Sequence, residues 1–331
     1  MIGNKSIKMV ILRNIPIILF IAIFLIFGIF SPKFISVDSF KNILVSSSYV
    51  GIIAIGIMFV LLTGGIDLSI GSVMYLSAAV TGLSVQKLQV PTVLAIIIGL
   101  GIATLVGVIN AFLIVILDIL PFITTLGMMV FVKAVGLLMT KSESVKLPKV
   151  ITSMGSQSVL GIPMPIIIFA IIILFGVLFL GKTKLGRQIY AVGNDVEEAR
   201  KAGIHTKKVL FTCYVMSALF AGIGGIISVA QIGIVNAAFG KGEEFNAIAA
   251  AVLGGVSLAG GVGKVFPGVV LGAVMIQMIQ AGLVFMQIDL YKQPLISAGI
   301  IFLAVFLDSI RSKYIAKAEK RNIRNENKGL Q

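Results

Sequence analysis

Apolar residues in this chain gather in long runs separated by short polar or glycine-rich segments. A helix needs about 20 mostly apolar residues to cross the hydrocarbon core of a bilayer. Runs of this kind lie at about 15–30, 43–62, 67–85, 91–117, 119–139, 163–180, 208–231, 245–258, 265–286 and 293–310. The pattern therefore predicts an all-α polytopic membrane protein with about ten transmembrane helices.

Two of the runs, 67–85 and 245–258, are short and bounded by glycine, which predicts one or two broken or re-entrant segments. Non-helical backbone is tolerated at membrane depth only inside protein or beside an aqueous path. Both runs are associated with a glycine-rich break, at 64–67 in the first half of the chain and at 240–244 in the second. Such a repeated arrangement is typical of transporters.

The composition excludes a soluble enzyme with one packed core. Hydrophobic residues make up 58% of the chain and charged residues only 12%, whereas soluble domains carry about 25% charge. A single cysteine and a single histidine exclude Cys-rich and paired-His metal sites, so no metal site is expected. We expect one transmembrane domain over residues 1–331, with a cytoplasmic loop at about 181–208 and a basic cytoplasmic tail at about 311–331.

The net charge of +14 suggests nucleic-acid binding until its distribution is considered. With ten spans and a cytoplasmic N-terminus, the inside segments hold 18 Lys and Arg residues and the outside segments hold 8. This bias agrees with the positive-inside rule. The charge therefore predicts a multi-pass protein with both termini in the cytoplasm and the bilayer as its surroundings, and it does not predict a nucleic-acid partner.

Asp67 lies between two apolar runs without a visible basic partner. A charge buried in a membrane costs several kcal/mol unless it is satisfied. Gly64 and Gly65 end the preceding helix, which places Asp67 to cap the next one by accepting from backbone N–H groups two or three positions on. Asp67 is then either a plain helix cap or, with Ser69, part of a broken helix that offers polar groups to a passing solute.

A second candidate begins at Pro121, which is tolerated in the first turn of a helix. Phe122, Thr124 and Thr125 follow it and would give a pathway one apolar and two hydroxyl contacts, which suits a neutral polyhydroxylated solute. Thr hydroxyls also commonly bond back to carbonyls of their own helix, and the pattern leaves that alternative open.

The sequence of the predicted cytoplasmic loop indicates a short helix with clear capping residues at both ends. Asn194 followed by Glu197 is a capping-box pattern, with acids in the first turn and Gly203 at the position after the C-cap. A helix of about eight residues is too short to be stable alone in water, so it needs a partner surface. Val196, Ala199 and Ala202 form a narrow apolar stripe that would fit a groove of another protein, unless the helix is simply solvated.

The chain contains no ATP-binding motif of its own. The segment 260–265 resembles a P-loop, but Leu258 stands where its first glycine belongs and Val265 stands where Ser or Thr is needed. If ATP powers this protein, another chain binds it. The ionisable residues in the spans are scattered, which disfavours a proton-coupled carrier.

Four blocks together resemble the permease subunits of bacterial ABC sugar importers of the ribose/xylose/galactose group. The blocks are Leu62–Ser72, Pro121–Gly127, Gly186–Ile204 and Gly242–Gly261, and the likeness runs from about Phe30 to Asp308. Asn246 stands where an acid is often found in this group.

The resemblance implies a permease in the bacterial inner membrane that imports a monosaccharide, with ribose or a related sugar as its cargo. It implies an ABC ATPase that binds ATP and Mg, an extracytoplasmic sugar-binding protein, and a second permease copy or paralogue; this chain would be no enzyme and would hold no cofactor. The implied pathway residues are Asp67, Ser69, Phe122, Thr124, Thr125 and Asn246. The implied ATPase-coupling residues are Gly186, Arg187, Gly193, Asn194, Glu197, Glu198, Ala199 and Gly203.

Two alternatives remain open at this point. A nucleoside permease of the same superfamily would share the cytoplasmic loop, although the block Gly65–Ser69 favours a sugar. A stand-alone ion-coupled carrier would share only the hydropathy.

Overall fold

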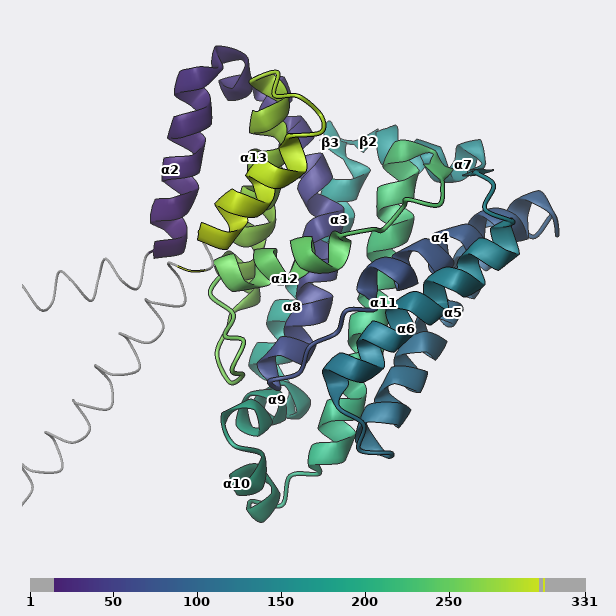
Figure 1. Cartoon of the computed structure of the whole chain (residues 1–331), viewed down its shortest axis with the longest axis vertical. Helices are drawn as coiled ribbons and strands as arrows, with labels where there is room; N and C mark the ends of the chain where they lie inside the picture. Colours follow the sequence, from purple (N-terminus) through teal and green to yellow (C-terminus); the bar gives the residue numbers. More distant parts are fainter. Residues whose placement is uncertain (1–14, 304–305, 307–331) are drawn as a thin grey trace, which may run out of the picture. The chain divides into compact units, whose positions relative to one another are not determined.

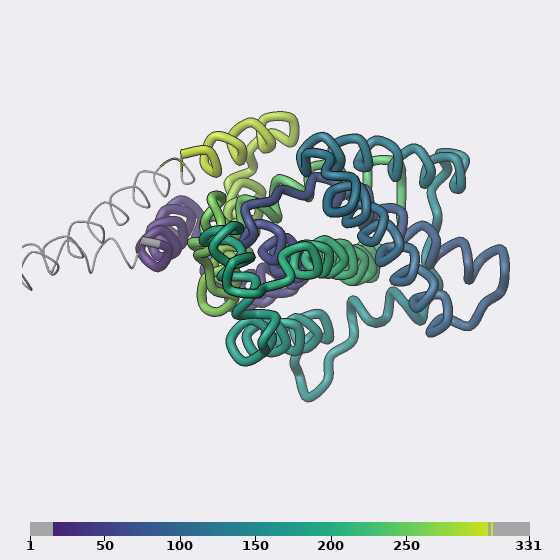
Figure 2. The backbone as a smooth tube through the Cα atoms, turned by 90° about the horizontal axis from the view of Figure 1, so that it is seen from below, coloured from purple at the N-terminus to yellow at the C-terminus, as the bar shows by residue number. Residues whose placement is uncertain are grey.

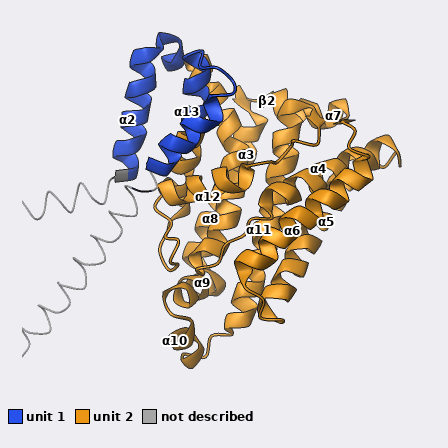
Figure 3. Ribbon diagram, in the orientation of Figure 1, with its two compact units in different colours: residues 1–36, 278–331 blue, residues 37–277 orange. Residues whose placement is uncertain are grey.

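The computed structural model describes residues 15–303 and 306, which belong to two compact units (Figure 3). Unit 1 comprises Met1–Ser36 and Met278–Gln331, and unit 2 comprises Val37–Gln277. The predicted basic tail at about 311–331 and the basic segment before residue 15 lie outside the described residues.

Unit 2 contains most of the helices (Figure 1). They are α3 (Val37–Leu62), α4 (Ile70–Gln86), α5 (Thr92–Val115), α6 (Pro121–Thr140), α7 (Lys149–Ser156), α8 (Met164–Lys182), α9 (Lys184–Asn194), α10 (Val196–Lys201), α11 (Thr206–Ile232) and α12 (Glu243–Leu253). Helix α13 (Val270–Phe285) follows the π-helical turn η2 (Val265–Val269) and passes from unit 2 into unit 1.

Unit 1 contains α2 (Ile15–Phe30), the 3₁₀ turn η1 (Pro32–Ile35), the end of α13 and a helix at Gln293–Leu303. Phe34 is buried and its ring contacts the rings of Phe27 and Phe285. A Cβ atom on Gly282 would lie 2.3 Å from the ring of Phe27, so glycine lets α13 approach α2 closely here.

Helix α11 lies in the middle of unit 2 and packs against α3, α4 and α5 (Figure 2). Small residues bring the backbones together, as is usual for helices in a membrane. A Cβ atom on Gly225 of α11 would lie 2.7 Å from the carbonyl oxygen of Met74 in α4, and one on Gly107 of α5 would lie 2.7 Å from the Cβ of Ala218 in α11. These close contacts form the packed core of unit 2 beside the candidate site.

Short elements occupy the two ends of unit 2. Helices α9 and α10 lie at one end, and α7 lies at the other with strands β2 (Ser158–Val159) and β3 (Ile162–Pro163) (Figure 1). These two strands form a hairpin, and β1 (Val145–Lys146) pairs antiparallel with β4 (Ile234–Val235). The segments joined by β1 and β4 were both predicted on the outer side, and α9 and α10 were predicted on the inner side.

Every predicted apolar run coincides with a helix in the described part of the chain, and the all-α polytopic fold is confirmed. Six of the described helices are long and apolar enough to cross a membrane: Val37–Leu62, Thr92–Val115, Pro121–Thr140, Met164–Lys182, Thr206–Ile232 and Val265–Phe285. Helices α4 and α12, which form at the two glycine-bounded runs, have 17 and 11 residues and fall short of that length. The single transmembrane domain over residues 1–331 stays a prediction.

Candidate functional site

The first glycine-rich break follows α3 directly. The backbone leaves the helix at Gly64, where φ is +76°, a conformation that glycine adopts without strain. The Thr63 hydroxyl donates to the carbonyl oxygen of Val60 at 2.8 Å, and the Gly65 N–H donates to the same oxygen at 3.1 Å. The Val60 carbonyl near the end of α3 therefore accepts both of these hydrogen bonds, although the residues that follow, 65–69, are not helical.

Asp67 is the centre of a fully buried polar network within this break. Its Oδ1 accepts from the backbone N–H of Ser69 at 2.9 Å and from the Ser69 hydroxyl at 2.6 Å, and its Oδ2 accepts from the Ser217 hydroxyl at 2.8 Å. Asn110 donates its Nδ2 to the Ser69 hydroxyl at 2.9 Å. The predicted bond to a backbone N–H two positions on is confirmed, but the prediction that Asp67 caps the next helix is wrong, because α4 begins at Ile70 and Ser69 holds the N-cap position. The network joins the start of α4 to α5 and α11.

Two polar atoms near this network have no hydrogen-bond partner in the structure. They are the Oδ1 atom of Asn110 and the hydroxyl of Tyr214, both buried. A Cβ atom on Gly65 would lie 2.6 Å from the Tyr214 hydroxyl, so any side chain at position 65 would displace this tyrosine. Because buried unpaired polar groups are costly, they are rare and mark places where a structure is adapted to something besides stability.

The start of α6 lies against the same break. The Thr125 hydroxyl donates to the Pro121 carbonyl at 2.9 Å and lies 3.4 Å from the Ile66 carbonyl. Thr124 and Thr125 are buried, whereas the Phe122 side chain is 53% exposed. Thr125 thus bonds back to its own helix, and of the three predicted residues only Phe122 has a largely exposed side chain.

The second break leads into α12. Gly240 and Gly242 both have positive φ, and α12 begins at Glu243. The Glu243 carboxylate accepts from the Tyr49 hydroxyl at 3.3 Å and from the Asn246 side-chain amide at 3.3 Å. Asn246 is therefore placed by Glu243, a residue that the sequence analysis did not select. Glu243 and Glu244 are adjacent acids between apolar runs, which is the pattern that singled out Asp67. The same pattern could have identified Glu243.

A basic side chain from α6 reaches the second break. The Lys133 ammonium group donates to the Phe239 carbonyl at 2.9 Å and lies 3.8 Å from the centroid of the Tyr75 ring. The buried carboxylate of Glu244 attracts this ammonium group. The lysine inside a predicted span is thus in contact with a carbonyl and an aromatic face, and a nearby carboxylate attracts it, which is how a charge is accommodated in a membrane.

The two breaks meet where α4 begins. A Cβ atom on Gly71 would lie 2.1 Å from the carbonyl oxygen of Gly240, and a Cβ atom on Gly240 would lie 2.1 Å from the carbonyl oxygen of Gly71. Real Cβ atoms do not approach carbonyl oxygens this closely, so both positions require glycine. The structure thereby brings the start of α4, just after the first break, against the second break, which is far away in the sequence.

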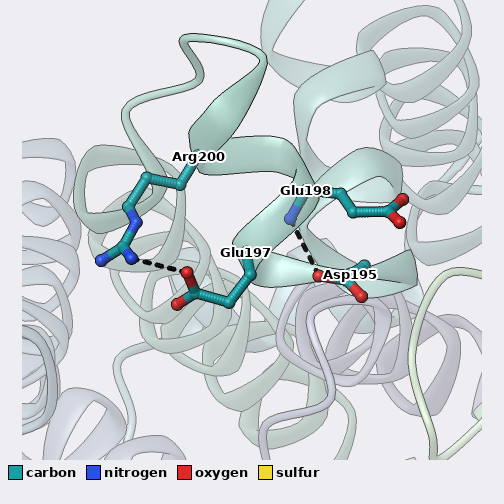
Figure 4. A network of polar contacts seen from close by, with 4 residues as sticks. All are labelled: Asp195, Glu197, Glu198 and Arg200. Atoms are coloured by element: carbon teal, nitrogen blue, oxygen red, sulfur yellow. Dashed lines mark hydrogen bonds and ion pairs between the residues drawn. The ribbon is translucent and has the colours of Figure 1, made fainter.

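The loop predicted on the cytoplasmic side, at about 181–208, forms two helices instead of one. The Thr183 hydroxyl accepts from the Gly186 N–H at 2.9 Å and caps α9, which extends as far as Asn194. The prediction that Asn194 caps the next helix is wrong, because Asn194 is still helical and the chain becomes extended only at Asp195. Asp195 is the cap of α10, since its Oδ1 accepts from the Glu198 N–H at 2.9 Å (Figure 4).

Helix α10 has six residues and carries exposed charges. The Glu197 carboxylate pairs with Arg200 at 2.5 Å (Figure 4) and so does not bond back to Asn194 as a capping box requires. Ala199 is buried, while Val196 and Ala202 are exposed, so the three do not form one continuous exposed stripe as predicted. Gly203 has φ of +80° and ends the helix as expected.

The remaining predicted coupling residues lie on α9. Gly186 is buried and lets α9 fold back on α8, because a Cβ atom there would lie 2.4 Å from the Phe179 carbonyl oxygen. Arg187 is exposed and donates to the Lys182 carbonyl at 3.3 Å. The Tyr190 hydroxyl donates to the Gly263 carbonyl at 2.9 Å. Burial raises the pKa of Tyr190, so this hydroxyl keeps its proton and remains a donor.

Comparison with known proteins relates the chain to permeases. The profile of the family described as "Branched-chain amino acid transport system / permease component" matches residues 39–307. The ribose import permease protein RbsC of Escherichia coli (strain K12) is 34% identical over 284 residues, which cover 84% of this chain and 88% of that protein.

Further relatives carry other sugars in their names. The D-allose transport system permease protein AlsC of Escherichia coli (strain K12) is 34% identical over 290 residues, covering 87% of this chain and 89% of that protein. The fructose import permease protein FrcC of Rhizobium meliloti is 31% identical over 304 residues, covering 89% and 84%. No solved structure matches the chain.

Proposed function

This chain belongs to the family of permease components of branched-chain amino acid transport systems, and on that basis we propose that it is the transmembrane permease subunit of an ATP-driven monosaccharide importer. Relatives covering most of the chain are named as permeases for ribose, allose and fructose. A sugar is therefore a better candidate cargo than an amino acid, and ribose or a related pentose or hexose is the first to test.

The observation that carries this proposal is the contact between Gly71, in the first turn of α4 just after the first break, and Gly240 of the second break, within a bundle of apolar helices. Transporters place discontinuous helices at the solute pathway because unwound backbone is tolerated there. The polar groups around the breaks include hydroxyls, amides and carboxylates joined by hydrogen bonds, and the Lys133 ammonium group there donates to the Phe239 carbonyl, so we propose a neutral polyhydroxylated cargo. No covalent chemistry is required of this chain.

Within the pathway we assign different roles to the predicted residues. Phe122 and Asn246 contact the cargo, since Phe122 is exposed and Asn246 is half-buried at the start of α12. Asp67 and Ser69 hold the first break in shape from inside the protein, together with Thr125. Thr124 is buried with an unpaired hydroxyl and becomes available to cargo only when α6 moves.

We assign the energy input to a separate ABC ATPase that binds ATP and Mg and docks on α9 and α10. The exposed acids of α10 and the turn at Gly203 support this role, because a short capped helix at the end of a bundle is a well-defined contact for a partner. ATPase closure would move this element and reorient the two breaks, giving alternating access.

The assembly that we propose also contains an extracytoplasmic sugar-binding protein and a second permease copy or paralogue. The binding protein sets the affinity, so the permease needs only weak contact with its cargo. The site of action is the bacterial inner membrane, with both termini in the cytoplasm, as the charge bias predicts.

Uptake of labelled sugars by cells lacking this chain tests the proposal and separates it from a nucleoside permease. Cells that express the chain should take up labelled ribose, allose, galactose or fructose faster than cells without it, and unlabelled nucleosides should not compete. A chain-dependent uptake of nucleosides with no uptake of any sugar would overturn the assignment.

A further inference from the structure

The end of helix α9 touches the end of helix α3 and a loop that follows α12. The carbonyl oxygen of Leu62, the last residue of α3, accepts from the Gly261 N–H at 2.9 Å. A carbonyl at a helix end has no partner inside the helix, so a neighbouring segment commonly supplies one. The Tyr190 hydroxyl donates to the Gly263 carbonyl of the same loop at 2.9 Å. Three segments far apart in the sequence thus meet at one place.

Gly193 lies at the centre of this contact. A Cβ atom at position 193 would lie 1.8 Å from the Leu62 carbonyl oxygen and 2.6 Å from the Gly261 nitrogen. A Cβ atom on Gly260, where φ is +91°, would in turn lie 2.7 Å from the Gly193 carbonyl oxygen. All of these neighbours are backbone atoms, so no side-chain rotation can relieve the contact. The three backbones are packed directly against one another.

The two segments that Gly193 touches lead to the two breaks. Leu62 is followed by the unwound stretch that contains Asp67, whose carboxylate accepts from Ser69 at the start of α4 and from Ser217 of α11. Gly261 lies between α12, which begins at the second break, and α13. A displacement of the end of α9 would therefore push against the backbone next to both broken segments at once.

We propose that Gly193 is a positioning residue that transmits movement of the docking element, α9 and α10, to both broken segments through its backbone contact with Leu62 and Gly261. This proposal rests on the proposed function, in which an ATPase moves the docking element. Close-packed backbone contacts are suited to the task because packed interiors shift between discrete arrangements and do not deform continuously.

The test uses the full chain reconstituted in liposomes with its ATPase and binding protein, and it measures sugar imported per ATP hydrolysed. Gly193→Ala should still co-purify with the ATPase, but its sugar-to-ATP ratio should fall by about 5-fold or more, the lower range of a typical coupling between sites. Gly181→Ala is the matched control, because a Cβ atom at position 181 meets nothing within 4 Å, and its ratio should equal that of the unaltered protein.

A milder variant keeps the test decisive if Gly193→Ala does not fold. Tyr190→Phe removes the hydrogen bond to Gly263 and keeps the ring, and its ratio should fall by about 2-fold or more, as the loss of one hydrogen bond would produce. A purely structural contact would lower the thermal stability of these variants and leave the ratio unchanged.

The outcomes separate this inference from the proposed function. If the unaltered chain binds no ATPase and imports sugar without ATP, the proposed function fails and the inference fails with it. If the unaltered chain imports sugar with ATP but every folded variant keeps the original ratio, only the inference is overturned.

Discussion

Gly71 and Gly240 are in backbone contact across 169 positions of sequence, so that a Cβ atom on either would lie 2.1 Å from the carbonyl oxygen of the other. Gly71 lies in the first turn of α4, directly after the first glycine-rich break, and Gly240 lies in the second break, so their contact brings the two breaks into one site. The account of transport depends on this arrangement and on the Asp67 network beside it.

Replacing Gly71 by alanine should destabilise the protein. The added methyl group must displace the Gly240 backbone, and forced overpacking of this kind costs about 1–3 kcal/mol. The measurement is the thermal unfolding midpoint of the purified protein in detergent, which should fall. Gly101→Ala on α5 serves as control, since a Cβ atom there meets nothing within 4 Å. An equal midpoint for the two variants would refute the close contact.

Asp67→Asn should lower stability because the carboxylate accepts three hydrogen bonds, whereas an amide brings two donors into the same space. We expect a loss of about 1–3 kcal/mol, and a smaller loss of about 1 kcal/mol for Ser217→Ala, which removes one donor. Thermal unfolding again gives the comparison, with Asp38→Asn, an exposed acid of α3, as control. A variant with unchanged stability but no transport would instead place Asp67 in direct contact with cargo.

Asp195→Ala should loosen helix α10. The lost N-cap bond to the Glu198 N–H is worth about 1 kcal/mol, so the amides of this helix should exchange with deuterium several-fold faster. Asn194→Ala should leave their exchange unchanged, because Asn194 ends α9 and caps nothing. Faster exchange in Asn194→Ala and not in Asp195→Ala would restore the cap that the sequence pattern suggested.

Reversing both Glu197 and Glu198 to lysine should abolish co-purification of the ATPase without loss of folding. Both side chains are exposed, and the pair of Glu197 with Arg200 contributes little to stability because water screens it. The charge reversal of Glu143, an exposed acid in a loop predicted on the outer side, should leave ATPase binding intact. Undiminished co-purification of the double variant would contradict the docking role of α10.

Hydropathy predicted the helices well because a bilayer demands long apolar runs wherever the chain crosses it. It located their ends less well. Helix α3 begins at Val37 instead of near residue 43, since its first turns contain polar residues such as Asp38 and Lys41 that an apolar criterion leaves out. Helix α12 ends at Leu253 instead of near residue 258, where Gly254 and Gly255 interrupt it.

The candidate site could be predicted only where its signal is local. The bond from the Ser69 N–H to Asp67 joins neighbours in the sequence, and it was foreseen. The bond of Tyr49 to Glu243 and the pairing of β1 with β4 join distant segments, so no local pattern announces them. The cap of α10 was misplaced by one residue because Asn194 and Asp195 are both good caps, and the preceding helix decided between them.

The most direct test of the central claim is sugar uptake into liposomes that contain the chain, its ATPase and its binding protein. The account predicts that labelled ribose, or whichever sugar the cellular assay identifies, enters only when ATP is hydrolysed. Uptake should stop when hydrolysis is blocked, and it should not respond to a proton or sodium gradient. Uptake that persists with hydrolysis blocked and follows an ion gradient would contradict the account and identify an ion-coupled carrier.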